Sequence, residues 1–187
     1  TINARQAADR PPWGGARGDW WTMAHALRYL RDHRPRFMFL SLNDADEWGH
    51  RGEYGHYLAT LRTYDDWIRR VLAAFDASGD YGRATTLIVT TDHGRGEGAR
   101  WRDHGGVTGD RPVWMVVVPP GQRSGLVVRT TGVTHVDLRP TIEAIVGLTP
   151  RACDGCGRAI AEVIVQDEFT HDVVLGGGDL WLVYDTT

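Results

Sequence analysis

The sequence contains no lysine, because all 21 basic residues of the 187-residue chain are arginine. Biased genome composition explains this absence more simply than function does. An excess of either charge is also missing: the formal net charge is -3, which gives no reason to expect nucleic acid or an anionic membrane as a partner. No apolar run approaches the ~20 residues that a membrane-spanning helix needs. Residues 1–19 are too polar for a signal peptide.

Cysteine is scarce as well, with only Cys153 and Cys156 in a C-x-x-C spacing. A structural zinc site usually needs a second pair of ligands, and the sequence has no further cysteine. A redox-active pair normally opens a helix after a strand, whereas this pair lies in a loop-like segment. We therefore expect a local disulfide or two free thiols, and the cysteines leave the cellular compartment undecided.

Apolar periodicity predicts an α/β fold, with a sheet flanked by helices and a C-terminal β-hairpin. Residues 1–18 are rich in Pro and Gly and predict an extended N-terminal arm, followed by a single domain over residues 19–187. The expected core tryptophans are Trp20, Trp21, Trp67 and Trp114. The expected elements are a helix from an Asp19 N-cap to Asp32, a strand at 37–42, a helix at 54–75, strands at 86–90 and 112–118, an edge strand at 126–128, a helix at 135–146 and a hairpin over 172–184.

Carboxylates and imidazoles gather in three short stretches, each expected on a loop and two of them just past a strand. In the first stretch the two ligand types are four residues apart, so one helical turn or a compact loop of similar reach would bring them to the same ion. Ligands of α/β sheets bind beyond the carboxyl ends of strands, so we expect these side chains to converge there. Five ligands are too many for one tetrahedral zinc but suit two ions ~3.5–4 Å apart. The mixed ligand set favours zinc, with manganese as the alternative. Any one stretch by itself would more often be a solvated loop. The five residues are Asp46, His50, Asp92, His93 and His104.

Several neighbours of these ligands have two interpretations. Asp44 is the alternative to Asp46 as a ligand, although its spacing to His50 is less favourable. His135 either binds metal or positions the helix that follows it. Four arginines either grip a phosphate or belong to a solvated loop. Two tryptophans beside the ligands are candidates to line a substrate pocket. These residues are Arg95, Arg100, Arg102, Arg111, Trp48 and Trp101.

Four segments together resemble the alkaline phosphatase superfamily, which includes alkaline phosphatases, nucleotide pyrophosphatases/phosphodiesterases, cofactor-independent phosphoglycerate mutases and sulfatases. They are Leu-Asn-Asp-Ala-Asp-Glu-Trp-Gly-His at 42–50, Thr-Thr-Asp-His-Gly at 90–94, His-Gly-Gly at 104–106 and Thr-His-Val-Asp-Leu-Arg-Pro-Thr at 134–141. The resemblance covers about residues 20–163, and it implies that the predicted sheet is part of an alkaline-phosphatase-like sheet flanked by helices. It implies that Asp46, His50 and His104 hold one metal ion and that Asp92 and His93 contribute to a second.

The resemblance implies a metal-dependent hydrolase that uses two divalent ions on a small-molecule phosphate or sulfate ester. The alternatives are a sulfatase, a phosphodiesterase or a phosphomutase on the same scaffold, or a non-catalytic metal-binding remnant. The location stays undecided from the sequence, and the resemblance slightly favours a periplasmic or extracellular one.

The family's nucleophile lies upstream of the stretch where this sequence begins to match. Thr22 is rejected as nucleophile because it lies within an expected helix that no strand precedes. We therefore expect this chain to be the C-terminal part of a longer enzyme and close to inactive on a phosphate ester by itself. Missing strands would leave an open sheet edge, through which we expect self-association.

Overall fold

The computed structural model describes residues 2–14, 17–120, 133–164, 175–177 and 180–182. The chain folds into two compact units, and each is described by itself. The helical unit comprises residues 1–83 and 101–103, and the sheet unit comprises residues 84–100 and 104–187. Among the described residues, no helix combines the length and the apolar character that a membrane span requires.

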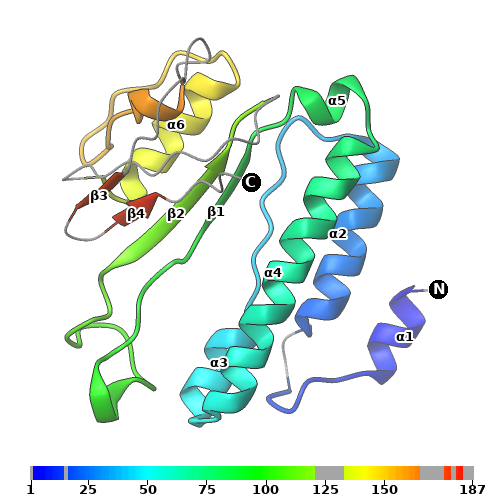
Figure 1. Ribbon diagram of the computed structural model, residues 1–187, viewed down its shortest axis with the longest axis vertical. Coiled ribbons are helices and arrows are strands. Elements are labelled where there is room, and N and C mark those ends of the chain that lie inside the picture. The colour runs from blue at the N-terminus through cyan, green and yellow to red at the C-terminus, as the bar shows by residue number, and fades with distance from the viewer. Residues whose placement is uncertain (1, 15–16, 121–132, 165–174, 178–179, 183–187) are drawn as a thin grey trace. The chain divides into compact units, whose positions relative to one another are not determined.

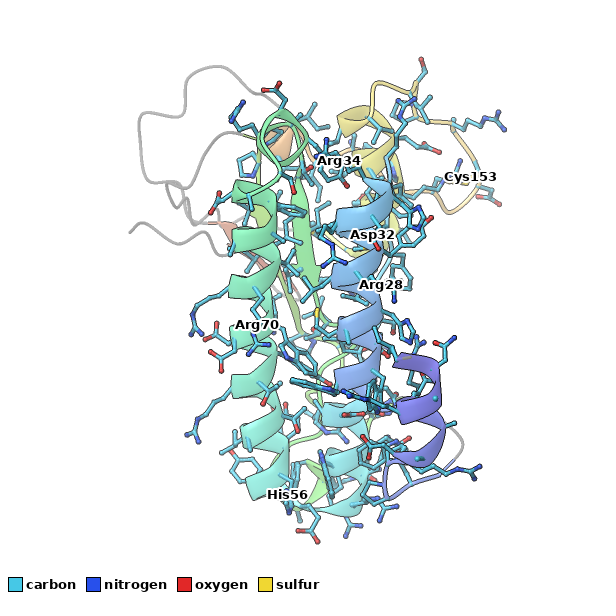
Figure 2. All side chains as sticks on the ribbon, turned by 90° about the vertical axis from the view of Figure 1, so that its right-hand side faces the viewer. Arg28, Asp32, Arg34, His56, Arg70 and Cys153 are labelled. Carbon is cyan, nitrogen blue, oxygen red and sulfur yellow. A yellow bond between two sulfur atoms is a disulfide. The ribbon has the colours of Figure 1, made fainter. Side chains whose placement is uncertain are left out.

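Five helices make up the helical unit. Figure 1 shows α2 and α4 running side by side, with α3 at one end of α4. The sides on which α2 and α4 face each other bury Met23 and Leu30 from α2 and Trp67 and Val71 from α4. The opposite side of α2 is polar, and there Arg28 forms a salt bridge with Asp32 one turn later (Figure 2). The helices are α1 (Ile2–Ala8), α2 (Asp19–His33), α3 (Asp44–Arg51), α4 (Tyr54–Asp76) and α5 (Asp80–Arg83).

The N-terminal part of this unit differs from expectation in three respects. Residues 2–8 form α1, so the extended arm expected over residues 1–18 contains a helix. Gly18 occupies the N-cap position of α2, and Asp19 is the first helical residue. Trp20 was expected in the core but is 55% exposed, although its ring centroid lies 6.3 Å from that of the buried Trp67. The long helix expected over 54–75 is confirmed as α4.

The apolar segment Phe37–Leu42 was predicted as a buried strand, and this prediction is wrong. The segment carries no strand assignment, and Phe37 and Phe39 are 61% and 81% exposed. Alternate residues (Met38 and Leu40) are half-buried, so the segment keeps a two-residue periodicity. A strand requires a hydrogen-bonded neighbour, and none pairs with this segment among the described residues.

Among the described residues of the sheet unit, four strands form a sheet in the order β1-β2-β4-β3. β1 is antiparallel to β2, β2 is parallel to β4, and β3 is antiparallel to β4. The predicted α/β fold class, a partial sheet accompanied by helices, is confirmed. The strands are β1 (Leu87–Thr90), β2 (Val113–Val118), β3 (Leu175–Gly177) and β4 (Leu180–Leu182), and the helices are α6 (Leu138–Ile145) and the short 3-10 turns η1 (Gly98–Arg100), η2 (His135–Asp137) and η3 (Ala161–Val163).

β2 carries the centre of this unit's core. Its residues alternate in burial, so Met115 and Val117 are fully buried whereas Trp114 is 38% exposed. The expectation that Trp114 belongs to the core is therefore wrong, because it lies on the other face of the pleat from Met115. Ile160 and Val163 pack against the buried face of β2 and complete the cluster.

The C-terminal part confirms two local predictions. β3 and β4 form the predicted antiparallel hairpin, although β3 begins at Leu175. Cys153 and Cys156 are joined in a disulfide, the first of the two expected states. The predicted edge strand at 126–128 and the outer hairpin residues 172–174 and 183–184 lie outside the described residues. The boundaries of the expected domain, 19–187, stay a prediction.

Candidate metal centre

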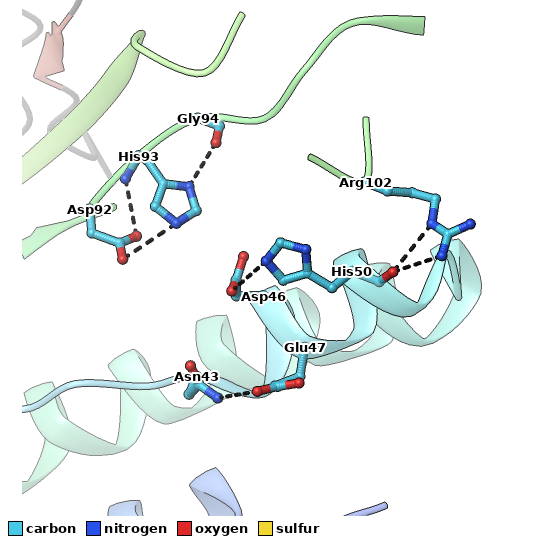
Figure 3. Close-up of polar contacts among 8 residues, drawn as sticks. All are labelled: Asn43, Asp46, Glu47, His50, Asp92, His93, Gly94 and Arg102. Carbon is cyan, nitrogen blue, oxygen red and sulfur yellow. Dashed lines mark hydrogen bonds and ion pairs between the residues drawn. The ribbon is translucent and has the colours of Figure 1, made fainter. Parts of the chain in front are cut away.

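Asp46 and His50 lie on one face of α3, which is a helix rather than the expected loop. Their spacing of four residues brings the side chains together across one turn. The His50 Nε2 atom lies 3.2 Å from the Asp46 Oδ2 atom, and both side chains are partly open to solvent (Figure 3). An imidazole nitrogen and a carboxylate oxygen are ligand types that divalent ions such as zinc accept.

Asp44, the alternative ligand, is used differently. Its Oδ2 atom accepts a hydrogen bond from the backbone N–H of Asp19 at 3.1 Å. Burial and the negative charge of Asp19 raise the pKa of the Asp44 carboxyl to about 6. The structure thus favours Asp46 over Asp44 as the residue that accompanies His50.

Arg102 holds the far end of α3. Its Nε and Nη2 atoms donate to the carbonyl oxygen of His50 at 3.2 and 2.9 Å (Figure 3). Gly52, which ends α3 with a positive φ of 74°, lies against the guanidinium, so a Cβ atom there would lie 3.0 Å from the Arg102 Nε. Neither interpretation of Arg102 from the sequence, a phosphate ligand or a solvated loop residue, included this contact with a helix carbonyl.

Aromatic side chains surround this end of the helical unit. Trp48 stacks on His56 with ring centroids 4.4 Å apart, and it also meets the edge of Trp13. Trp101 packs against Tyr54 and Tyr57. Both tryptophans flanking the predicted ligands are therefore engaged with other aromatic rings, and their part in a substrate pocket stays a prediction.

In the sheet unit, Asp92 and His93 follow the carboxyl end of β1. The Asp92 Oδ1 atom accepts the His93 backbone N–H at 3.0 Å, and the His93 Nδ1 atom lies 2.8 Å from the carbonyl oxygen of Gly94 (Figure 3). A carbonyl oxygen only accepts, so this hydrogen bond places the imidazole proton on Nδ1. Nε2 then carries the lone pair that a metal ion requires, as is usual for ligating histidines.

His104 stacks on His93, with ring centroids 3.7 Å apart and ring planes inclined by 15°. The topology explains how residues eleven positions apart meet. Because β1 and β2 are antiparallel, with Thr90 opposite Met115, the chain beyond β1 must return to the same edge of the sheet to begin β2. The sequence predicted that the Gly-rich loop at 105–106 would fold back, and within the sheet unit it does.

Asp110 organises this loop and was missed by sequence analysis. Its buried carboxylate accepts the backbone N–H groups of Gly106 and Val107, directly after His104. These hydrogen bonds, above all the one from Gly106, lower the pKa of Asp110. The Asp110 carbonyl also accepts the Gly94 N–H at 2.7 Å, so one residue links the segments that carry His93 and His104. An acidic residue a few positions after a Gly-Gly pair was the available signal.

His135 lies behind the Asp92–His93 pair rather than beside the ligands. Its Nε2 atom lies 2.7 Å from the carbonyl oxygen of Thr91, to which it must donate. This contact fixes the backbone immediately before Asp92, and neither interpretation drawn from the sequence, a metal ligand or a residue that positions the following helix, included it.

A family model with the description Metalloenzyme superfamily matches residues 21–147. The chain belongs to this superfamily. The match covers all five predicted ligands, and it confirms the resemblance to the alkaline phosphatase group. No solved structure matches the chain.

Two curated proteins similar to this chain carry the name 2,3-bisphosphoglycerate-independent phosphoglycerate mutase. The protein from Haloarcula marismortui is 23% identical over 125 residues, which cover 66% of this chain and 23% of the relative. The protein from Natronomonas pharaonis is 26% identical over 125 residues, which cover 66% of this chain and 24% of the relative. The aligned part thus spans about a quarter of the length of each relative.

Proposed function

We propose that this chain supplies metal ligands to a site for phosphoryl transfer on a small-molecule phosphate ester. The observation that carries the proposal is the stacking of His93 on His104, with the His93 proton held at Nδ1 by the Gly94 carbonyl. The stacked pair places two imidazole nitrogens close together, where each could serve one of two neighbouring ions. The match to the Metalloenzyme superfamily supports the same interpretation.

The family resemblance assigns the ligands to two ions. Asp46, His50 and His104 would hold the first, and Asp92 and His93 would contribute to the second. Nitrogen and carboxylate oxygen donors together fit zinc best, with manganese as the alternative. When bound, such ions polarise phosphoryl oxygens and stabilise the charge of an in-line displacement.

The protein's own residues contribute orientation. Gly94 fixes the tautomer of His93, Asp110 fixes the turn after His104, and Arg102 fixes the carbonyl end of the helix that carries His50. Each contact lies directly behind a proposed ligand. Partners of this kind commonly change metal affinity by ~10–100-fold when they are removed.

The phosphoryl group has two possible acceptors. Transfer to water is the hydrolase reaction expected from the sequence. Transfer within a substrate is the phosphomutase alternative, and the names of the two relatives favour it. Sulfate ester and phosphodiester chemistry receive no support from the comparisons.

Metal content tests the proposal. Wild-type protein loaded with zinc or manganese and then dialysed should retain up to two ions, measured by mass spectrometry of the metal. His93→Ala and His104→Ala should each lower this content, because each removes a nitrogen donor. His33→Ala, which alters an exposed histidine at the end of α2, is the matched control and should retain the wild-type content. Equal metal content in all four proteins would contradict the proposal.

A further inference from the structure

The beginning of α3 is capped by a different helix. Asn43, at its N-cap position, makes no side-chain cap hydrogen bond. Instead the Asp19 carboxylate, at the first residue of α2 and only 2% exposed, accepts the backbone N–H groups of Asn43 at 2.9 Å and Asp44 at 2.7 Å. A helix N-terminus needs acceptors for its first N–H groups, and a carboxylate also complements the positive end of the helix dipole.

Tyr64 of α4 extends this cap. Its hydroxyl donates to Asp19 and accepts the backbone N–H of Ala45 at 3.1 Å. Burial, followed by the hydrogen bond to Asp19, raises the pKa of Tyr64, so the hydroxyl stays protonated and able to donate. The N–H groups of three successive residues, 43 to 45, are thus satisfied by side chains from α2 and α4.

The start of α2 is in turn capped by a residue of α3. The N-cap of α2 is Gly18, which has no side chain, and the first N–H of that helix donates to Asp44 at 3.1 Å. The starts of α2 and α3 therefore cap each other. Each carboxylate therefore serves the first N–H groups of the other's helix.

We propose that Asp19 and Tyr64 are positioning residues that fix the orientation of α3 and thereby align Asp46 and His50 for metal binding. This inference depends on the proposed function. α3 has only eight residues, too few to be stable in isolation, so its orientation depends on its anchors. The anchored N–H groups begin three residues before Asp46, and His50 follows one turn later on the same short helix.

The test uses Co²⁺ as a spectroscopic probe, titrated into the full 187-residue chain with visible absorption as the readout. We expect Asp19→Asn and Tyr64→Phe to weaken Co²⁺ binding by ~10–100-fold and to change the ligand-field bands, because coordination by Asp46 and His50 is distorted. The matched controls Asp32→Asn and Tyr29→Phe alter exposed residues of α2 and should reproduce the wild-type titration. Thermal unfolding without metal measures the purely structural effect of each variant.

The possible outcomes are distinguishable. If wild-type protein gives no ligand-field bands, the proposed function fails and this inference fails with it. If wild-type protein binds Co²⁺ and Tyr64→Phe binds it with the same affinity and spectrum, the positioning role is wrong while the metal site stands. Tyr64→Phe removes one hydroxyl and leaves the buried ring, so it serves as the deciding variant should Asp19→Asn fail to fold.

Discussion

Asp46 and His50 lie one turn apart on a regular helix, whereas His93 and His104 are brought together by an irregular, glycine-containing loop. On α3 the helical geometry sets the spacing, and side chains from α2 and α4 hold the helix start. In the sheet unit the spacing depends on backbone conformations at Gly94, Gly105 and Gly106 and on the Asp110 carboxylate. The helical pair should therefore tolerate backbone substitutions that the loop pair does not.

The largest expected effect comes from Gly94→Ala. A Cβ atom there would lie 2.6 Å from the Gly109 carbonyl oxygen and 2.7 Å from the Pro112 carbonyl oxygen, so the backbone must shift. We expect a loss of about 2–3 kcal/mol in the free energy of unfolding, measured by urea denaturation. Metal retention should fall as well, because His93 moves.

Gly55→Ala is the matched control for this substitution. Gly55 lies in the first turn of α4, and nothing lies within 4 Å of a Cβ atom placed there. Alanine should leave stability unchanged or raise it by up to about 1 kcal/mol. A loss at Gly55 as large as that at Gly94 would show that the contrast between loop and helix is wrong.

Asp110→Asn should have the second largest effect on the free energy of unfolding, and this effect should depend on pH. Backbone hydrogen bonds hold the pKa of Asp110 below its ordinary value of 3.8, so the folded state releases this proton more readily than the unfolded state does. The resulting stability is present above pH 3.8 and is lost as pH falls through the lowered folded pKa. Wild-type protein should therefore lose more stability than Asp110→Asn between about pH 5 and pH 3.

Denaturation curves at several pH values check this prediction. The variant should be the less stable protein at pH 7, and the two curves should approach each other in acid. A constant difference at every pH would mean that the Asp110 carboxylate does not hold the turn after His104 through its charge.

Arg102→Lys should have the smallest effect of the three. Lysine keeps the charge but cannot donate two N–H groups to the His50 carbonyl oxygen in the same geometry. We expect the free energy of unfolding to fall by about 1 kcal/mol and metal binding to weaken a few-fold. Calorimetric titration with Zn²⁺ measures the affinity. Arg62→Lys, at an exposed position of α4, is the matched control, and an equal change in both variants would remove Arg102 from the account.

The sequence predicted the elements whose signals are local. α4, β1, β2 and α6 follow from periodicity within each segment, and the D-x-x-x-H spacing predicts that Asp46 and His50 meet across one turn. The strand at Phe37–Leu42 was predicted wrongly because strand formation depends on a partner that the segment's own pattern does not specify.

Contacts between distant residues were the other class that sequence reasoning missed. Asp19 carries the signature of an N-cap, yet it caps a helix that begins 25 residues later, because its own helix starts one residue earlier than the pattern suggested. Arg102 likewise binds a carbonyl 52 residues away. In neither contact are the two partners separated by a characteristic number of residues, so no sequence motif predicts it. The loop pair was partly foreseen, since the glycines after His104 indicated a chain reversal.

The proposed ligands should act on shared ions, and calorimetric titration of a double variant measures whether His50 and His104 serve the same one. Zn²⁺ or Mn²⁺ is titrated calorimetrically into wild-type protein, His50→Ala, His104→Ala and the double variant. If both histidines serve one ion, each single variant loses that ion and the double variant retains the same remaining stoichiometry as either single variant. Two outcomes would contradict a shared ion. In one, the double variant binds fewer ions than either single variant; in the other, both single variants bind metal as the wild-type protein does.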